Sequence, residues 1–425
     1  MNLVQITPGA GGMYCGNCFR DNTMVRELRA LGHTILMLPL YLPMTLDEPD
    51  ESAGAPVFFG GINVYLQQQS SLFSHAPNWF RQLVSHPRLL KWAGGKAAKT
   101  HASDVGEMTL SMIRGEEGRH ARELRELTTW LAAQQKTDAV CLSNGMLIGM
   151  ARELKRTLTT RVVCSLQGED QFLDDLGSPH SQQCWDEIIE RAREVDRFVA
   201  PSKYYGDIMT ERLKLRPGQL SVVHSGISLD GYDVESPRPQ PSRPTLGFFA
   251  RMCREKGLDR VVKAYLIARR KVPSLRLKIG GACGPSDLPL VEECKRDLAQ
   301  AGAMQDVEFH PNLSRPDKIQ FLKSLSFLSV PVRYKEDFGL YVLESMAAGT
   351  PVVQNRCCAF PELVDATGGG VMCDDTEEAL AAVYVDLAQS PDAAKRLGET
   401  GKTAVQKQFS SRAMALRMSE VFERA

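Results

Sequence analysis

Short apolar segments alternate with helical segments along most of the 425-residue chain, and this alternation limits the fold more than any other feature. In the first half, a helical pattern at 19–31 places Met24, Leu28 and Leu31 on one face. Apolar runs that fit strands lie at 3–7, 34–38, 139–142, 161–166 and 197–200. Strands that alternate with helices indicate an α/β class with a doubly wound parallel sheet.

A proline-rich segment divides the chain. Four prolines lie between Pro237 and Pro244, where no hydrophobic periodicity is visible. The alternation then restarts, with strand patterns at 246–250, 275–279, 327–330 and 351–354 and helical patterns at 258–269 and 341–348. We therefore predict an N-terminal domain over 1–235, a linker over 236–244, a second domain over 245–405 and a C-terminal helix within 406–425.

The composition is that of a water-soluble protein without a dominant charge. Lys plus Arg and Asp plus Glu number 51 each, so no global field favours nucleic acid or an anionic membrane. The eleven cysteines are scattered, no secretion signal is visible, and the most apolar run (TILMLPLYLPM) is too short to span a bilayer. These features predict a cytoplasmic protein with reduced thiols and no nucleic-acid partner.

One stretch, about 41–114, is too long for a simple connection and is expected to be an insertion in the first domain. It interleaves aromatic residues such as Trp79 and Trp92 with basic residues such as Arg81 and Lys96. One interpretation is an acceptor-side subdomain with a small aromatic core. The other is a surface for a lipid-linked acceptor or for peripheral contact with the inner face of the cytoplasmic membrane.

The segment KEDFGLYVLESMAAGTPVV, from Lys335 to Val353, carries the strongest chemical pattern. Glu336 and Glu344 are separated by seven residues, and a helix that starts near Gly339 leaves its first N–H groups unpaired. Those of Phe338, Gly339 and Leu340 can bind sugar hydroxyls or a diphosphate oxygen. Glycine at 339 lets a ligand approach without a Cβ in the way.

A second string, FFARMCREKGLDRVV, places Arg251 and Lys256 in the loop that follows a predicted strand. Breaking a glycosidic bond to a nucleotide diphosphate requires stabilisation of negative charge on the departing phosphates. Two fixed cations supply it without a metal ion. The loop belongs to the same domain as the two glutamates, so one donor site is expected.

Together these strings resemble retaining glycosyltransferases of the GT-B fold, family-four type (glycosyl transferases group 1). The resemblance implies two Rossmann-like domains that face each other across a cleft, with a C-terminal helix that crosses back. It assigns the leaving diphosphate to Arg251 and Lys256, the donor sugar to Glu336 and the ribose to Glu344. It also implies front-face transfer of a hexosyl or related group from a nucleotide-diphospho-sugar, most commonly a UDP-sugar, to a hydroxyl acceptor, without cofactor or metal. Polysaccharide or glycolipid biosynthesis is the expected setting.

The glycine-rich turn after the first strand contains Gly9, Gly11 and Gly12. In the resemblance this loop meets the donor phosphate, so Gly11 and Gly12 are candidate donor-binding residues. Cys15 and Cys18 in the same turn form a C-x-x-C pair without a second pair at metal-binding spacing. We interpret these cysteines as structural, with a thiol cluster that includes Cys253 and Cys357 as the alternative.

The first domain departs from the family pattern. Gln167 stands where many relatives have histidine. Asn144 belongs to the string Leu142-Ser143-Asn144, which stands where relatives have an H-x-H-like element. Glu169 and Asp170 follow, either as acceptor ligands or a base, or as favourable charges at a helix start. Asn144, Gln167, Glu169 and Asp170 are therefore candidates for binding the acceptor and the donor sugar.

Two other functions stay open from the sequence. One is a nucleotide-sugar epimerase or hydrolase with the same two-domain shell, and the other is a non-catalytic carbohydrate-binding relative. The donor base, the sugar, the acceptor and the oligomeric state are not specified by these motifs.

Overall fold

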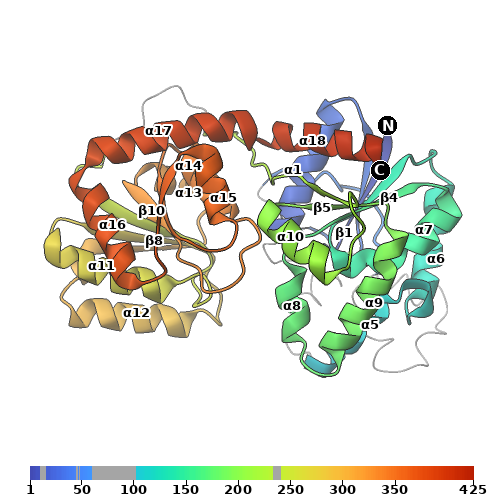
Figure 1. Ribbon diagram of the computed structural model, residues 1–425, viewed down its shortest axis with the longest axis horizontal. Helices are drawn as coiled ribbons and strands as arrows, with labels where there is room; N and C mark the ends of the chain where they lie inside the picture. The colour runs from blue at the N-terminus through green and yellow to red at the C-terminus, as the bar shows by residue number, and fades with distance from the viewer. Residues whose placement is uncertain (10–15, 45, 47, 60–101, 233–240) are drawn as a thin grey trace. The chain divides into compact units, whose positions relative to one another are not determined.

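The computed structural model describes residues 1–9, 16–44, 46, 48–59, 102–232 and 241–425 (Figure 1). The described chain forms two compact units. The N-terminal unit contains residues 1–224 and 414–425, and the C-terminal unit contains residues 225–413. Most of the predicted insertion (60–101) and the start of the predicted linker (through 240) lie outside the described residues.

The N-terminal unit is built on a six-stranded parallel sheet with the order β2-β1-β3-β4-β5-β6. Residues of one strand alternate between the two faces, so Val4 and Ile6 join one apolar cluster while Leu3 joins the other. The strands are β1 (Asn2–Thr7), β2 (Thr34–Pro39), β3 (Ala139–Leu142), β4 (Arg161–Ser165), β5 (Arg197–Ala200) and β6 (Leu220–Val222).

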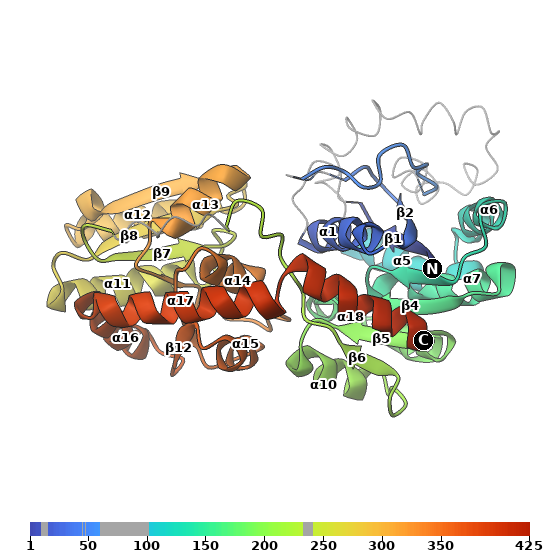
Figure 2. The same ribbon diagram turned by 90° about the horizontal axis from the view of Figure 1, so that it is seen from above.

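Helices cover both faces of this sheet. On one face, α1 (Gly16–Ala30) and α18 (Ser411–Arg424) lie side by side and share an apolar cluster (Figures 1 and 2). The remaining helices of this unit are α5 (Ala102–Ile113), η3 (Gly115–Glu117), α6 (Ala121–Ala132), η4 (Gly145–Met150), α7 (Ala151–Leu158), α8 (Glu169–Asp175), α9 (His180–Arg191), η5 (Ala192–Glu194) and α10 (Lys203–Arg212).

The C-terminal unit has a second six-stranded parallel sheet, with the order β12-β11-β10-β7-β8-β9. Its central strands are almost wholly buried and read as apolar runs, as expected for a parallel sheet covered on both faces. The strands are β7 (Thr245–Phe249), β8 (Arg276–Gly281), β9 (Val307–Pro311), β10 (Phe327–Ser329), β11 (Val352–Asn355) and β12 (Gly370–Cys373).

In this unit α11 (Leu258–Lys271), α12 (Leu288–Gln300) and α16 (Glu377–Gln389) cover one face of the sheet (Figure 1). The opposite face carries α13 (Arg315–Lys323), α14 (Leu340–Ala347), α15 (Phe360–Thr367) and α17 (Pro391–Gln408). A short turn, η6 (Met304–Asp306), precedes β9. Ser314 and Thr376 cap α13 and α16 by accepting backbone N–H groups, which explains where these helices start.

The two doubly wound sheets confirm the predicted α/β class. The division falls between 224 and 225, earlier than the expected 235, because the segment after 224 is bonded to the C-terminal unit. There Arg315 donates to the carbonyl oxygens of Ser228 and Asp230, at 3.2 and 3.4 Å. Near the C-terminus, α17 ends one residue after Lys407, and α18 returns the chain to the N-terminal unit.

Among the described residues, no helix combines the length and the apolar character that crossing a membrane requires.

Candidate active site

The candidate site of the C-terminal unit lies between β7 and β10, where the order of strands in the sheet reverses. β7 pairs with β8 on one side and with β10 on the other, and the chain continues from β7 to β8 but from β10 to β11, so the two connections run in opposite directions from neighbouring strand ends. In open parallel sheets this is the position where ligands bind. Arg251 and Lys256 lie in the loop after β7, and Glu336 lies in the loop after β10.

Gly257 lets these two loops approach closely. Its φ is +79°, and a Cβ at this position would lie 2.0 Å from the carbonyl oxygen of Pro331. Next to it, the Arg333 N–H donates to the Glu255 carbonyl oxygen at 2.8 Å. A side chain at 257 would both strain the backbone and push the loops apart.

The loop contact brings Lys256 and Glu336 together. Lys256 Nζ lies 2.5 Å from Glu336 Oε2, and the two side chains are 18% and 9% exposed. The hydroxyl of Tyr341 donates to the same carboxylate oxygen at 3.1 Å, and the ring of Tyr334 lies 4.8 Å from Nζ. Two residues predicted to act on one donor thus form one ion pair.

The surroundings of this ion pair keep Lys256 protonated. Burial opposes a charge on Lys256, but the Glu336 carboxylate outweighs burial, and the pKa of Lys256 is raised above its ordinary value. Burial and the nearby Glu336 also raise the pKa of Tyr334 to about 12. At neutral pH the site therefore contains a lysinium ion and neutral tyrosine.

Arg251 is held by a carboxylate that the sequence reasoning missed. Its Nε donates to Asp287 Oδ1 at 3.0 Å, and its Nη2 donates to Ser286 Oγ at 3.2 Å. Asp287 is 5% exposed and also accepts the Gly284 N–H at 2.9 Å. Asp287, which directly precedes α12, holds one side of the guanidinium, and 55% of the Arg251 side chain stays exposed.

Gly339 precedes α14 with a φ of +88°, a conformation that other residues rarely adopt. Phe338 is buried against Phe409, with 6.5 Å between ring centroids, so its side chain is a core residue. A Cβ at position 339 would lie 3.0 Å from Cε1 of Phe360, so the missing side chain makes room for packing within the unit and not, as the sequence had suggested, for a ligand. The predicted start of this helix is correct to within one residue.

Glu344 forms an ion pair with Lys318, which the sequence reasoning also missed. Lys318 Nζ lies 2.7 Å from Glu344 Oε1, and the two side chains are 14% and 18% exposed. Lys318 comes from α13 and Glu344 from α14, so two neighbouring helices orient the carboxylate. The second carboxylate oxygen, Oε2, is the one that this pair leaves for a ligand.

The cysteines do not gather into a metal site among the described residues. Cys358 Sγ donates to the Tyr334 carbonyl oxygen at 3.2 Å, and Cys357 Sγ accepts from Asn355 Nδ2 at the same distance. Burial raises the pKa of the Cys253 thiol. Cys18 is buried in α1, whereas Cys15, Gly11 and Gly12 lie outside the described residues.

The candidate acceptor residues of the N-terminal unit lie at the carboxyl ends of β3 and β4. Asn144 caps η4 by accepting the Met146 N–H at 3.1 Å. Gln167 Nε2 donates to the Ser143 carbonyl oxygen at 2.5 Å. That contact joins the ends of the two strands and fixes the orientation of the Gln167 amide.

Glu169 and Asp170 begin α8 and are buried. Glu169 accepts the N–H groups of Gly145 and Gln167 at 2.7 and 2.6 Å, and the Tyr205 hydroxyl at 3.1 Å. Burial raises the pKa of Glu169 despite these bonds. The Tyr205 hydroxyl also lies 3.1 Å from Asp170 Oδ1, so its one proton is shared between the two carboxyl groups, while Asp170 Oδ2 is buried without a partner among the described residues. Through its bonds to Gly145 and Gln167, Glu169 links the loop after β3 to the loop after β4.

A buried polar group beneath these loops was not predicted. Asp21 accepts from Ser143 Oγ and from Gln5 Nε2, and Arg20 Nη2 donates to Ser165 Oγ at 2.9 Å. Burial raises the pKa of Asp21. The signal available in the sequence was the Arg-Asp pair one turn into a helix that follows a glycine-rich turn.

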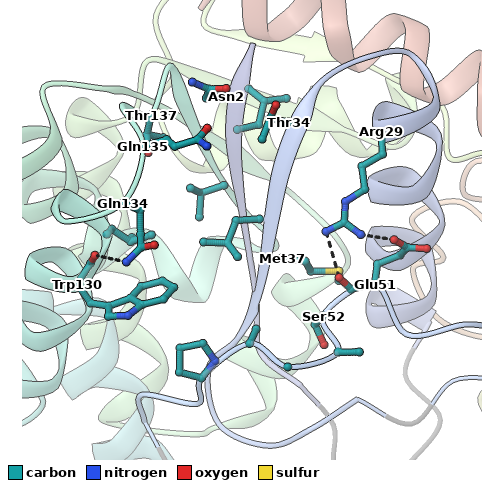
Figure 3. A pocket seen from close by; sticks show the side chains of 18 residues that line it. Asn2, Arg29, Thr34, Met37, Glu51, Ser52, Trp130, Gln134, Gln135 and Thr137 are labelled. Carbon is teal, nitrogen blue, oxygen red and sulfur yellow. Dashed lines mark hydrogen bonds and ion pairs between the residues drawn. The ribbon is translucent and has the colours of Figure 1, made fainter.

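A separate pocket of about 420 Å³ lies on the N-terminal unit, away from these residues (Figure 3). Trp130 and Gln134 line one side, and the Arg29–Glu51 ion pair lines the other. It includes Asn2, at the amino end of β1, whereas the candidate residues lie at carboxyl ends. The pocket is therefore not part of the predicted site.

Comparison with known proteins connects this site to a family. Residues 233–404 match the family model described as glycosyl transferases group 1. A D-inositol 3-phosphate glycosyltransferase of Streptomyces griseus is 30% identical over 230 residues, covering 48% of each chain. A glycogen synthase of Mycobacterium tuberculosis is 25% identical over 244 residues, covering 57% of this chain and 56% of the relative. The chain spans about half the length of these relatives.

Two solved structures share the fold over the whole chain. Sucrose-phosphate synthase from Thermosynechococcus elongatus superposes with a TM-score of 0.69 at 16% identity, covering 100% of this chain and 98% of that one. Anabaena HepE in complex with UDP gives 0.69 at 13% identity and covers both chains fully. These similarities establish the GT-B fold. In sequence, the similarity to the glycosyl transferases group 1 family lies in residues 233–404.

Proposed function

We propose that this protein is a retaining glycosyltransferase that moves a sugar from a nucleotide-diphospho-sugar to a hydroxyl acceptor. The Lys256–Glu336 ion pair carries this proposal. It lies at the switch point of the C-terminal sheet, in the same loop system as Arg251. A purely structural ion pair would not require a second cation, held by its own carboxylate, at the same strand end.

In the proposed reaction, the acceptor oxygen bonds to the anomeric carbon on the face from which the diphosphate departs. The bond between that carbon and the phosphate oxygen breaks, and the acceptor proton passes to the departing phosphate. Lys256 and Arg251 stabilise the charge that develops on the diphosphate. No protein nucleophile is needed, and the charge on Lys256 is secured by its contact with Glu336.

The remaining residues orient the donor. Glu336 accepts from hydroxyls of the sugar, the backbone N–H groups of 338–340 bind polar ligand atoms, and Glu344 accepts from the ribose. Since Lys318 occupies Oε1 of Glu344, we assign the ribose to Oε2. Asn144, Gln167, Glu169 and Asp170 are proposed to shape the acceptor and sugar side of the N-terminal unit.

Uridine is the base we propose, because the solved relative HepE binds UDP and UDP-glucose. The acceptor is a hydroxyl of a glycan, a lipid-linked molecule or a small molecule. We also propose a cytoplasmic location, since eleven scattered cysteines suit a reducing compartment.

The test begins with calorimetric titration of UDP, ADP, GDP and the corresponding glucose conjugates. The nucleotide sugar that binds is then incubated with candidate acceptors, with and without EDTA, and the product is analysed for anomeric configuration. We expect transfer with retention in both conditions. Release of free sugar or of an epimer at the same rate without acceptor would replace this proposal with a hydrolase or epimerase. Failure of every nucleotide to bind would favour a carbohydrate-binding protein.

A further inference from the structure

A second hollow of the C-terminal unit lies at the edge of the sheet opposite to the candidate active site. Its volume is about 220 Å³, and Thr245 and Arg276, the first residues of β7 and β8, contribute to it. Arg251, in contrast, follows the carboxyl end of β7. The hollow is lined by Pro241, Ser242, Arg243, Thr245, Arg276, Lys278 and Ser324.

Three of these lining residues are cations and three carry hydroxyl groups. Arg276 and Lys278 are two residues apart on β8, so both side chains project from the same face of the sheet. Lys278 Nζ donates to Ser324 Oγ at 3.2 Å, which holds the ammonium group at the hollow. Three like charges around so small a space repel one another unless an anion offsets them.

The neighbouring carboxylates offset this charge only in part. Glu308 Oε atoms are 3.7 and 3.8 Å from Arg276 and Lys278, beyond hydrogen-bond distance, whereas Glu308 lies 3.1 Å from His310. Asp306 is shared between Arg243 at 3.0 Å and Arg269 at 2.8 Å. Two carboxylates thus serve four arginine and lysine side chains.

Arg276 presents a partly exposed guanidinium at the hollow, with 36% of its side chain exposed. Its Nε is buried and has no hydrogen-bond partner among the described residues. A ligand in the hollow does not reach this buried atom, so the terminal N–H groups of the partly exposed guanidinium are the donors that Arg276 offers to an anion. Phosphate offers several strong acceptor oxygens, which match guanidinium, ammonium and hydroxyl donors.

We propose that this hollow binds the phosphate group of a small anion, either inorganic phosphate or a phosphomonoester. Its volume is below the range of sites for drug-sized ligands, which favours a compact ligand. The site is separate from the donor site, and the proposal does not depend on the proposed transferase activity.

The test is calorimetric titration of the full chain with inorganic phosphate and with glycerol 3-phosphate, at ionic strength matched with sodium chloride. We expect wild type to bind, and the double variant Arg276→Gln/Lys278→Gln to bind at least about tenfold more weakly, because two charge-assisted contacts are lost. The matched control is Arg270→Gln/Lys271→Gln, which removes two exposed charges from α11 in the same unit. Its affinity should equal that of wild type.

Tighter binding of glycerol 3-phosphate assigns the site to phosphomonoesters, and tighter binding of inorganic phosphate assigns it to inorganic phosphate. Circular dichroism of each variant verifies that it is folded. Absence of binding to wild type would overturn the proposal. So would unchanged binding in the Arg276/Lys278 variant, since the phosphate would then occupy another cationic site.

Discussion

Lys256 and Glu336 are 80 residues apart in the chain, yet their Nζ and Oε2 atoms lie 2.5 Å apart at the carboxyl edge of the C-terminal sheet. Because each residue is the other's counter-ion, changing one alters the charge state and position of its partner. The pair therefore has to be tested as a unit.

We expect Lys256→Ala and Glu336→Ala each to abolish sugar transfer while the protein remains folded. Each single variant leaves one mostly buried charge unpaired, which should cost about 2 kcal/mol of unfolding free energy, less than for a fully buried pair. The double variant Lys256→Met/Glu336→Gln should regain most of this stability but no activity. Urea unfolding and product formation measure the two effects. Transfer at the wild-type rate in either alanine variant would contradict the assignment of the site.

The raised pKa of Lys256 predicts how the pair responds to pH. A lysine in the unfolded chain titrates near about 10.4, and the folded value is higher. The pair's contribution to stability is therefore complete below about pH 10.4 and is lost as the pH rises through the folded pKa. The difference between the urea midpoints of wild type and the Met/Gln double variant should be constant from pH 7 to 10, and above that range the wild-type midpoint should fall relative to that of the variant.

Chemical labelling offers a second readout of the same pKa. With a limiting amine-reactive reagent near pH 9, Lys256 should be modified far less than the exposed Lys271. In Glu336→Gln its modification should increase several-fold. Equal labelling of Lys256 and Lys271 in wild type would show that the ion pair does not protect the amine.

Asp287 should matter for activity although it is not expected to touch the donor. Asp287→Asn loosens Arg251, so we expect kcat to fall by roughly tenfold, the effect of losing about 1.4 kcal/mol of transition-state stabilisation. The control is Glu293→Gln, which removes one carboxylate partner of neighbouring Arg254 and leaves its ion pair with Asp259. That variant should retain wild-type kinetics. Equal losses in both variants would point to a general charge effect.

Lys318 should control recognition of the ribose through Glu344. In Lys318→Met, the carboxylate loses its orienting partner, and the preference for UDP over 2′-deoxy-UDP should shrink by several-fold. Competitive inhibition constants for the two nucleotides measure this preference. Lys295→Met, which breaks an exposed pair with Glu292, is the control and should keep the wild-type ratio. A general loss of affinity with an unchanged ratio would contradict the assigned role.

Gly257 should tolerate no side chain. Gly257→Ala places a Cβ 2.0 Å from the Pro331 carbonyl oxygen and strains a positive φ, so both stability and transfer should decline. Gly302→Ala has a φ of +63° but meets nothing within 4 Å, so it isolates the strain, about 1–2 kcal/mol. Thermal unfolding of the two variants separates strain from the steric clash. Equal destabilisation would show that the loops adjust without cost.

The sequence revealed the interior strands but not three edge strands. β7 and β10 are buried and apolar, and their patterns were recognised. β6, β9 and β12 each lie at a sheet edge and are partly exposed, and two of them contain only three or four residues. An exposed edge needs no continuous apolar run, so periodicity gives no signal there.

The same contrast applies to the site. Arg251, Lys256 and Glu336 were predicted as site residues because they occupy local strings with recognisable spacing. Asp287 and Lys318 were missed because their importance arises from contacts 36 and 26 residues away along the chain. A single sequence contains no pattern that pairs such positions. Packing alone brings them together.

The last helix has a consequence for how the protein is made. Met414, Met418 and Phe422 of α18 are nearly fully buried against α1 and the sheet of the N-terminal unit. Domains generally begin to fold in the order in which the ribosome produces them. Here one apolar face of the first unit stays uncovered until residue 422 has been synthesised. The part of the protein that is translated first is therefore completed last.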